Sequence, residues 1–141
     1  PIALCCDHSG FRMKELAKKL LTKNEVPYID FGTYVGKDCD YNEYVAAAVS
    51  SMTNKVADFG MGFCRTGQGV NILANHLPGI RSALVIDEYT AEYSIRHNCA
   101  NFFAVPEKYV SEDMLDRMIK IWKDATFDGG RHMTRMKKTI G

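Results

Sequence analysis

Short apolar runs alternate with amphipathic stretches along almost the whole chain. Five apolar runs have the length of strands: residues 2–6, 26–31, 57–63, 80–86 and 101–105. Helical spacing of the apolar residues follows each run: residues 12–23, 41–52, 68–75, 90–97 and 111–125. The pattern therefore predicts five strands, each followed by a helix.

This alternation favours a parallel sheet, because parallel strands need crossover connections and helices supply them. We expect an α/β, Rossmann-like domain of three layers, α/β/α, around a five-stranded parallel sheet. The strand order does not follow from the pattern. Gly129 and Gly130 interrupt the helical spacing, and residues 131–140 then have a basic, helical composition. They predict a C-terminal helical arm that is able to reach a partner subunit.

Length and composition narrow the class of protein. The chain has 141 residues, of which 46% are hydrophobic, so one domain over residues 1–141 is expected. A net charge of +1 gives no reason to expect a nucleic-acid partner, although the basic residues near the C-terminus suit a single anion. No apolar run approaches the ~18 residues of a membrane span, and residues 1–4 lack the basic start of a signal peptide.

The cysteines are irregularly spaced and odd in number, which indicates reduced thiols in a cytoplasmic protein rather than a disulfide framework. The five are Cys5, Cys6, Cys39, Cys64 and Cys99.

A glycine-rich turn follows the third apolar run and contains Cys64, Thr66, Gly67 and Gly69. Ligands of open parallel sheets bind at the carboxyl ends of the strands, which is where this turn is expected. A helix N-terminus favours the thiolate form of a nearby cysteine, and its N–H groups can hold an oxyanion or a phosphate. An inert buried cysteine beside an ordinary tight turn is the alternative that the pattern leaves open.

Other polar residues at the ends of elements are also candidates, each with a plainer alternative. Asp7 and His8 follow the first run as a carboxylate and an imidazole, but Asp7 could cap the next helix. His97 ends a predicted helix, where it could simply complement the helix dipole. Arg131 and Arg135 are one helical turn apart. The two side chains either bind a phosphate together or form part of a solvated helix face.

Several other functions are disfavoured by their motifs. The spacing from Cys6 to Arg12 fits the C-x5-R loop of a small tyrosine phosphatase, but Met13 follows where Ser or Thr is needed and no Asp-Pro pair exists. The chain contains no G-x-x-x-x-G-K-[ST] nucleotide loop. It also lacks C-x2-C and H-E-x-x-H patterns, so no metal is implied.

Taken together, the motifs resemble those of the ribose-5-phosphate isomerase B family, which includes galactose-6-phosphate and allose-6-phosphate isomerase relatives. The matching segments occur in order through nearly the whole chain: Asp7-His8-Ser9-Gly10-Phe11, Asp30-Phe31-Gly32-Thr33-Tyr34, Asp40-Tyr41, Cys64-x-Thr66-Gly67-x-Gly69, Pro78-Gly79-Ile80-Arg81, His97-Asn98-x-Ala100-Asn101 and Gly129-Gly130-Arg131-His132.

The resemblance implies an aldose–ketose isomerase, with ribose 5-phosphate and ribulose 5-phosphate as its first candidate substrates. Such an enzyme moves a proton between C1 and C2 through an enediolate and needs no cofactor. Cys64 would be the carbon base and Thr66 would position it. The enediolate would be held by the residues of the following turn: Gly67, Gln68, Gly69, Val70 and Asn71.

The resemblance also assigns the remaining substrate contacts. His97 would protonate the ring oxygen while Asp7 handles the hydroxyl proton, and Tyr41 would pack on the sugar. The phosphate would lie among four basic residues: His8, Lys108, Arg131 and Arg135. In this family the site is shared by two subunits, and the neighbour contributes the equivalents of His97 and Asn98 and part of the phosphate cluster. The implied assembly is a homodimer, or a tetramer built from it.

The chain departs from the family pattern at five positions of this expected site. Arg65 stands where the family usually has glycine, Gln68 where it often has a small aliphatic residue, and Asn71 where it has serine. Cys99 stands where the family commonly has Asp or Asn, and Lys108 replaces a usual arginine. Two alternatives follow: an isomerase of a different tetrose or hexose phosphate, or a non-catalytic protein that binds a sugar phosphate.

Overall fold

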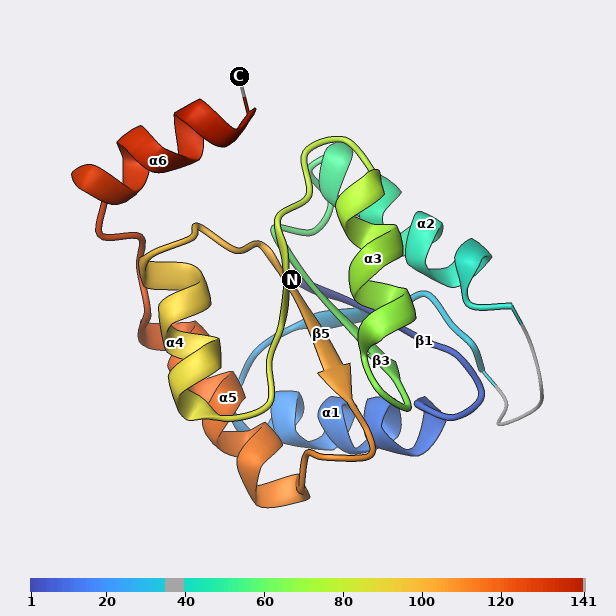
Figure 1. Ribbon diagram of the computed structural model, residues 1–141. Helices are drawn as coiled ribbons and strands as arrows, with labels where there is room; N and C mark the ends of the chain where they lie inside the picture. The colour runs from blue at the N-terminus through green and yellow to red at the C-terminus, as the bar shows by residue number, and fades with distance from the viewer. Residues whose placement is uncertain (35–39, 141) are drawn as a thin grey trace.

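The computed structural model describes residues 1–34 and 40–140, whose strands form one five-stranded parallel sheet (Figure 1). In chain order the strands are β1 (Ile2–Cys6), β2 (Tyr28–Asp30), β3 (Phe59–Cys64), β4 (Ser82–Leu84) and β5 (Phe102–Pro106). In space their order is β2-β1-β3-β5-β4, and every pair is parallel. The predicted α/β class and the five parallel strands are confirmed.

Helices cover both faces of the sheet, as predicted. α1 (Phe11–Lys23), α4 (Glu88–Arg96) and α5 (Glu112–Asp124) pack on one face, and α2 (Asn42–Thr53) and α3 (Gln68–His76) on the other. The sheet separates these two apolar layers because successive side chains of a strand point to opposite faces. In β1, Leu4 and Cys6 belong to the first layer, and Ala3 and Cys5 to the second.

The C-terminal helix α6 (Arg131–Ile140) projects from the body of the molecule, as the predicted arm (Figure 1). Within residues 1–34 and 40–140, no helix has both the length and the apolar character that crossing a membrane requires. The thiols of Cys5, Cys6, Cys64 and Cys99 are free, whereas Cys39 lies outside the described residues.

The two edge strands are shorter than predicted. β2 and β4 each comprise three residues, although the apolar runs extend over residues 26–31 and 80–86. Val26 and Ile80, the first residues of these runs, are buried for another reason, whereas Ile86 at the end of the second run is exposed. The N–H of Val26 donates to the carbonyl of Leu21 and closes the end of α1, and the N–H of Ile80 donates to the carbonyl of Leu77 in a turn. Burial in turns therefore extends an apolar run beyond its strand.

A charged side chain is buried completely in the layer that contains α1. Lys14 has no exposed surface, and its Nζ lies 2.6 Å from Oδ2 of Asp30 at the end of β2. Lys18 reaches the same oxygen at 3.1 Å. Burial raises the pKa of Asp30, but hydrogen bonds from Lys14, the Gly32 N–H and Lys18 outweigh it and hold the pKa below its ordinary value. The pair therefore remains charged and joins α1 to the end of β2.

The same carboxylate organises the loop that follows β2. Its Oδ1 accepts the N–H of Gly32 at 2.9 Å. The carbonyl of Gly32 accepts the N–H of Cys6 at 2.8 Å, and the N–H of Thr33 donates to the carbonyl of Cys6 at 3.1 Å. The ion pair thus fixes this loop beside the last residue of β1, one position before Asp7.

Replacing Asp30 should destabilise the protein strongly. Asp30→Asn leaves the buried ammonium of Lys14 without its counter-charge, which should lower the free energy of unfolding by about 3–5 kcal/mol. Urea titration followed by circular dichroism measures the change. Asp58→Asn is the matched control, because the Asp58 side chain is 77% exposed and, among the described residues, pairs with the N-terminus alone. The control should shift stability by no more than about 0.5 kcal/mol.

The loss should also depend on pH in a defined direction. Folding lowers the pKa of Asp30, so its stabilisation is complete above the unfolded-chain value of about 3.9 and disappears as the pH falls through the lower folded value. The stability difference between the wild type and Asp30→Asn should therefore stay constant near neutral pH and shrink below about pH 4. A difference that is equal at neutral and at strongly acidic pH would contradict this assignment.

Candidate active site

The strand order creates a switch point between β1 and β3. From β1 the chain continues to β2 on one side, whereas β3 and β5 lie on the other side. Ligands of open parallel sheets bind outside the carboxyl ends of the strands at such a point. The loops after β1, β3 and β5 all meet there. We call their polar residues the carboxyl-edge cluster: Asp7, His8, Cys64, Thr66 and Lys108.

Cys64 is the last residue of β3 and is only 6% exposed. It belongs to the apolar layer under α2 and α3, against which Tyr41 also packs. Its carbonyl accepts the N–H of Glu107 at 2.8 Å, and the carbonyl of Arg65 accepts the N–H of Lys108 at 2.9 Å. These two hydrogen bonds hold the loops after β3 and β5 side by side, so Lys108 starts next to the cysteine turn.

Two glycines give the turn its shape. Gly67 has φ of 76°, in the left-handed region, and a Cβ there would lie 2.4 Å from Cδ1 of Leu84. The left-handed residue reverses the chain so that α3 starts directly above the end of β3. A Cβ on Gly69 would lie 2.8 Å from the hydroxyl oxygen of Tyr41. Glycine there lets the Tyr41 ring contact the first turn of α3.

The first turn of α3 offers fewer N–H donors than the sequence predicts. The N–H of Asn71 donates to the carbonyl of Gly67 at 3.0 Å, so the expectation that this N–H holds the enediolate is corrected. The N–H of Gln68 faces the hydroxyl of Thr66 at 3.4 Å. Among the described residues, none accepts a hydrogen bond from the N–H of Gly69 or Val70. These two donors remain available to an oxyanion.

The side chains of the same turn differ in what they can contact. Val70 is completely buried, so it can reach a ligand only through its backbone. The side-chain oxygen of Asn71 accepts the hydroxyl of Ser82 at 2.7 Å and ties α3 to β4. Thr66 and Gln68 are both exposed.

Asp7 closes the turn that leads into α1. Its Oδ1 accepts the hydroxyl of Ser9 at 2.7 Å and the N–H of Gly10 at 2.9 Å. Helix α1 begins at Phe11, with Gly10 as its N-cap and no side-chain cap, so Asp7 is not the helix cap. The turn fixes one oxygen of the carboxylate and presents His8 as an exposed neighbour.

A second group of predicted residues gathers where α4 ends and α6 begins. A hollow of about 240 Å³ is lined there by Arg81, His97, Asn98, His132, Arg135 and Met136. The rings of His97 and His132 are stacked, with centroids 4.1 Å apart and an angle of 9° between their planes. Loss of solvation and the neighbouring His97 and Arg131 lower the pKa of His132, which favours its neutral form. We call this group the arm cluster.

Asp128 anchors the arm to α4. Its N–H donates to the carbonyl of Arg96 at 2.9 Å, and its carboxylate lies 3.2 Å from Nε of Arg96 and 3.7 Å from Nε2 of His97. Two imidazoles and a carboxylate are zinc-type donors. A metal ion bound by both imidazoles would have to lie in both ring planes, however, and the rings of His97 and His132 are nearly parallel. The nearly parallel rings therefore fit a stacked pair and do not fit two ligands of one metal ion.

The two clusters lie at opposite edges of the sheet. α4 starts after β4 at the carboxyl edge and runs back to the amino edge, where Asn101 leads into β5 (Figure 1). The side-chain oxygen of Asn101 accepts the N–H of Arg81 just before β4, which places this region at the start of the strands. His97 and Asn98 therefore do not meet Cys64 within one chain. The resemblance implies that a neighbouring subunit supplies His97 and Asn98, and their separation from Cys64 within one chain is consistent with that prediction.

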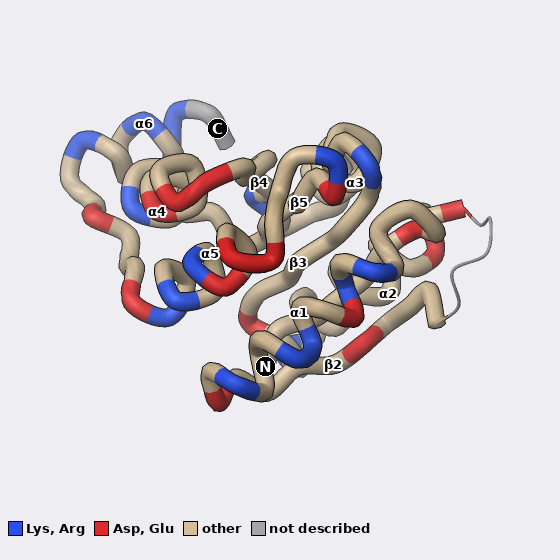
Figure 2. The backbone as a smooth tube through the Cα atoms, turned by 90° about the horizontal axis from the view of Figure 1, so that it is seen from below, with Lys and Arg blue, Asp and Glu red and all other residues tan. Residues whose placement is uncertain are grey.

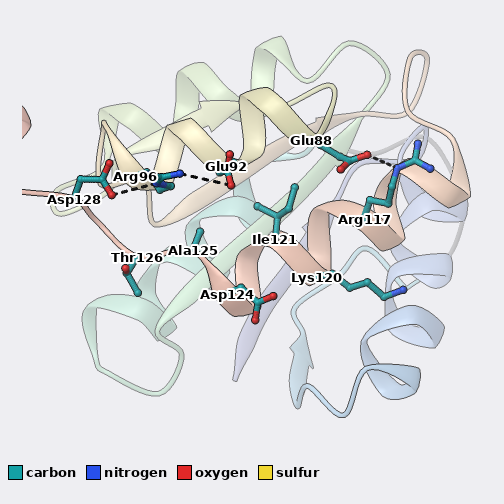
Figure 3. Close-up of a pocket in the computed structure, with 10 residues that line it drawn as sticks. All are labelled: Glu88, Glu92, Arg96, Arg117, Lys120, Ile121, Asp124, Ala125, Thr126 and Asp128. Carbon is teal, nitrogen blue, oxygen red and sulfur yellow. Dashed lines mark hydrogen bonds and ion pairs between the residues drawn. The ribbon is translucent and has the colours of Figure 1, made fainter.

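A further hollow, of about 560 Å³, lies between α4 and α5 (Figure 3). Its charged residues largely pair with one another: Arg117 lies 2.7 Å from Glu88, and Arg96 lies 3.8 Å from Glu92. It contains none of the site residues that the sequence predicts.

Sequence reasoning missed Arg81 and His132, which belong to the arm cluster, and Asp128, which anchors it. Arg81 donates from Nε to the carbonyl of Asn98 at 2.8 Å and so fixes the turn after α4. His132 stacks on His97, and Asp128 anchors both helices. Arg81 and His132 do occur in the quoted motifs, which was a usable signal. Asp128 directly precedes the two glycines that interrupt the helical spacing, and no motif marks it.

The comparisons with known proteins agree with the fold. A family model described as Ribose/Galactose Isomerase matches residues 2–139. The chain is 32% identical over 136 residues to ribose-5-phosphate isomerase B of Escherichia coli (strain K12), a match that covers 96% of this chain and 91% of that protein.

Solved structures give the same result. The chain superimposes on ribose-5-phosphate isomerase B of Clostridium thermocellum with a TM-score of 0.93 and 36% identity, covering 98% of this chain and 93% of that one. It superimposes on the Mycoplasma genitalium enzyme with bound ribulose-5-phosphate with a TM-score of 0.90 and 29% identity, covering 99% and 93%.

Removing the anchor should loosen the arm. Asp128→Ala deletes the contacts to Arg96 and His97, so amide hydrogen exchange in residues 131–138 should become faster while exchange in the sheet stays unchanged. Mass spectrometry of exchanged peptides measures both. Asp124→Ala is the matched control, since within the described part of the chain Asp124 forms no ion pair. Equal acceleration in both variants would contradict the role of Asp128.

Proposed function

The chain belongs to the ribose/galactose isomerase family, and from this premise we propose that it interconverts ribose 5-phosphate and ribulose 5-phosphate with Cys64 as the carbon base. The chain is a sugar-phosphate isomerase by its family. The relatives named above are ribose-5-phosphate isomerases B, and one of them binds ribulose 5-phosphate. These names support the choice of a pentose phosphate.

The observation that carries the proposal is a thiol next to two open N–H donors. Cys64 ends β3, and the N–H groups of Gly69 and Val70 in the first turn of the following helix have no acceptor among the described residues. The thiolate of Cys64 removes the proton from C2 of the open-chain aldose, and the electrons of that C–H bond form the enediolate. The two N–H groups stabilise the negative oxygen. Transfer of the O2 proton to O1 and return of the carbon proton to C1 then give the ketose.

Other residues of the carboxyl-edge cluster assist this transfer. Thr66 is exposed beside the turn and positions the substrate oxygens. Tyr41 packs against Gly69 and provides a flat surface for the sugar. Asp7, whose Oδ1 is held by Ser9 and Gly10, accepts the hydroxyl proton during ring opening. His8 and Lys108 are exposed at the same edge and contribute to phosphate binding.

The arm cluster completes the site from a second copy of the chain. Ring opening needs an acid, which we assign to His97, and the phosphate needs more positive charge than one edge supplies. Basic residues recur along α6, including Arg131 and Arg135, and the helix projects away from its own sheet (Figure 2). In a homodimer, the arm cluster of one subunit would meet the carboxyl-edge cluster of the other, and Asn98 would face the sugar.

Two alternatives follow from the residues that depart from the family pattern. Arg65 and Gln68 are exposed at the mouth of the turn, so they can alter which sugar fits. A tetrose or hexose phosphate is therefore the second candidate. A non-catalytic sugar-phosphate-binding protein is disfavoured by the family and by the presence of Cys64.

Replacing Cys64 should stop the chemistry but not the binding. Cys64→Ala should lower kcat for ribose 5-phosphate by about 10²–10⁴-fold, because the carbon base is lost. Exchange of the C2 proton in deuterated water should stop as well. Cys5→Ala is the matched control, since burial raises the pKa of that thiol and keeps it protonated. Full turnover by Cys64→Ala would exclude the role assigned here, and a panel of tetrose, pentose and hexose phosphates tests the substrate.

Two inactive variants should restore activity in a mixed dimer. Co-expression of Cys64→Ala and His97→Asn subunits leaves one site of each hybrid dimer with both groups intact, so about a quarter of wild-type activity should return at random pairing. The matched control combines Cys64→Ala with Thr66→Ala, which lie on the same edge and leave no intact site. Absence of recovery in the first mixture, or equal recovery in both, would contradict the shared site.

A further inference from the structure

We infer that Arg65 is a phosphate-binding residue of this chain, which supplies the bidentate contact that Lys108 cannot make. The inference rests on the proposed function, because it concerns the phosphate of the same substrate. Arg65 immediately follows Cys64 and is exposed at the carboxyl edge of the sheet.

The backbone holds Arg65 beside Lys108. The carbonyl of Arg65 accepts the N–H of Lys108 at 2.9 Å, one residue beyond the hydrogen bond between Cys64 and Glu107. The two long side chains therefore start from adjacent points at the ends of β3 and β5. The loop after β1, with exposed His8, lies on the other side of β3. Arg65 thus stands between the residues to which the phosphate is assigned.

The charges of Arg65 and Lys108 are not neutralised. In residues 1–34 and 40–140, neither side chain forms an ion pair or a hydrogen bond. Several cations elsewhere on the surface do have acidic partners: Arg117 pairs with Glu88, Arg96 with Asp128, and Lys120 with Asp116. Two cations that start from joined backbone positions and form no ion pair within these residues repel each other, and a bound dianion reduces that repulsion.

The chemistry of arginine favours phosphate over a sugar hydroxyl. A guanidinium presents a planar set of donors that matches two phosphate oxygens, whereas the ammonium of Lys108 acts as a point charge. A contact to the phosphate acts equally on substrate and transition state, because the phosphate does not react. Loss of Arg65 should therefore weaken binding and leave the chemical step unchanged.

The test compares Arg65→Ala and Arg65→Lys with Lys19→Ala. The control removes the same charge from an exposed position of α1. Arg65→Ala should raise KM for ribose 5-phosphate and the inhibition constant of inorganic phosphate in parallel, each by about 10-fold, with kcat changed by less than about twofold. Arg65→Lys should recover part of both, and Lys19→Ala should change neither.

Two results would overturn the inference. A fall in kcat at constant KM and constant phosphate inhibition would move Arg65 to the reacting carbons, and no change in any constant would make it a solvated side chain. Failure of the proposed function is recognised separately. If the wild type does not turn over ribose 5-phosphate, calorimetry can still measure the binding of inorganic phosphate to the wild type and to the same variants. If Arg65→Ala binds inorganic phosphate as tightly as the wild type does, the inference is overturned.

Discussion

The buried ion pair between Lys14 and Asp30 is the interaction on which the active edge of the sheet depends. The ammonium of Lys14 is completely buried and the carboxylate of Asp30 is partly buried, with Lys18 sharing Oδ2 and the Gly32 N–H donating to Oδ1. These additional contacts offset the cost of removing the charges from water. Through Gly32 the pair holds the end of β1, and the next residue there is Asp7. A buried charge thereby fixes the position at which the loop that begins with Asp7 leaves β1.

The position of the glycine-rich turn after β3 also depends on the end of β1. The N–H of Asp7 donates to the carbonyl of Phe63 at 3.2 Å, so the end of β1 is joined to the residue before Cys64. From there the left-handed Gly67 starts α3, whose first turn contains two N–H groups without an acceptor in the described part of the chain. One chain of contacts thus runs from a buried ammonium to these two donors.

Much of the fold could be predicted from the sequence because burial imposes a period on it. Strand-length apolar runs and helical spacing predicted all five strands of the described sheet and the C-terminal arm. The strands predicted around β2 and β4 were too long, because apolar residues in the neighbouring turns continue the runs. Lys14 could not be found this way, since its position in α1 looks like an ordinary exposed lysine until β2 is placed beside it. The lost donor of Asn71 likewise depends on where α3 begins, which is decided by one dihedral angle at Gly67.

The sequence predicts which residues belong to the candidate site, but their distances within one chain follow only from the fold. Motifs identify Cys64 and His97 as partners in one reaction, yet α4 carries His97 across the full height of the sheet, away from the carboxyl edge. The resemblance already assigned the two groups to different subunits, and the fold gives a physical reason, because α4 ends away from the carboxyl ends of the strands. The stack of His97 on His132 and the anchor at Asp128 hold the arm rigidly at the amino edge. Under the proposed mechanism, His97 held there could serve Cys64 only by association of two chains, and the same residues would then have to satisfy both the reaction and a subunit interface.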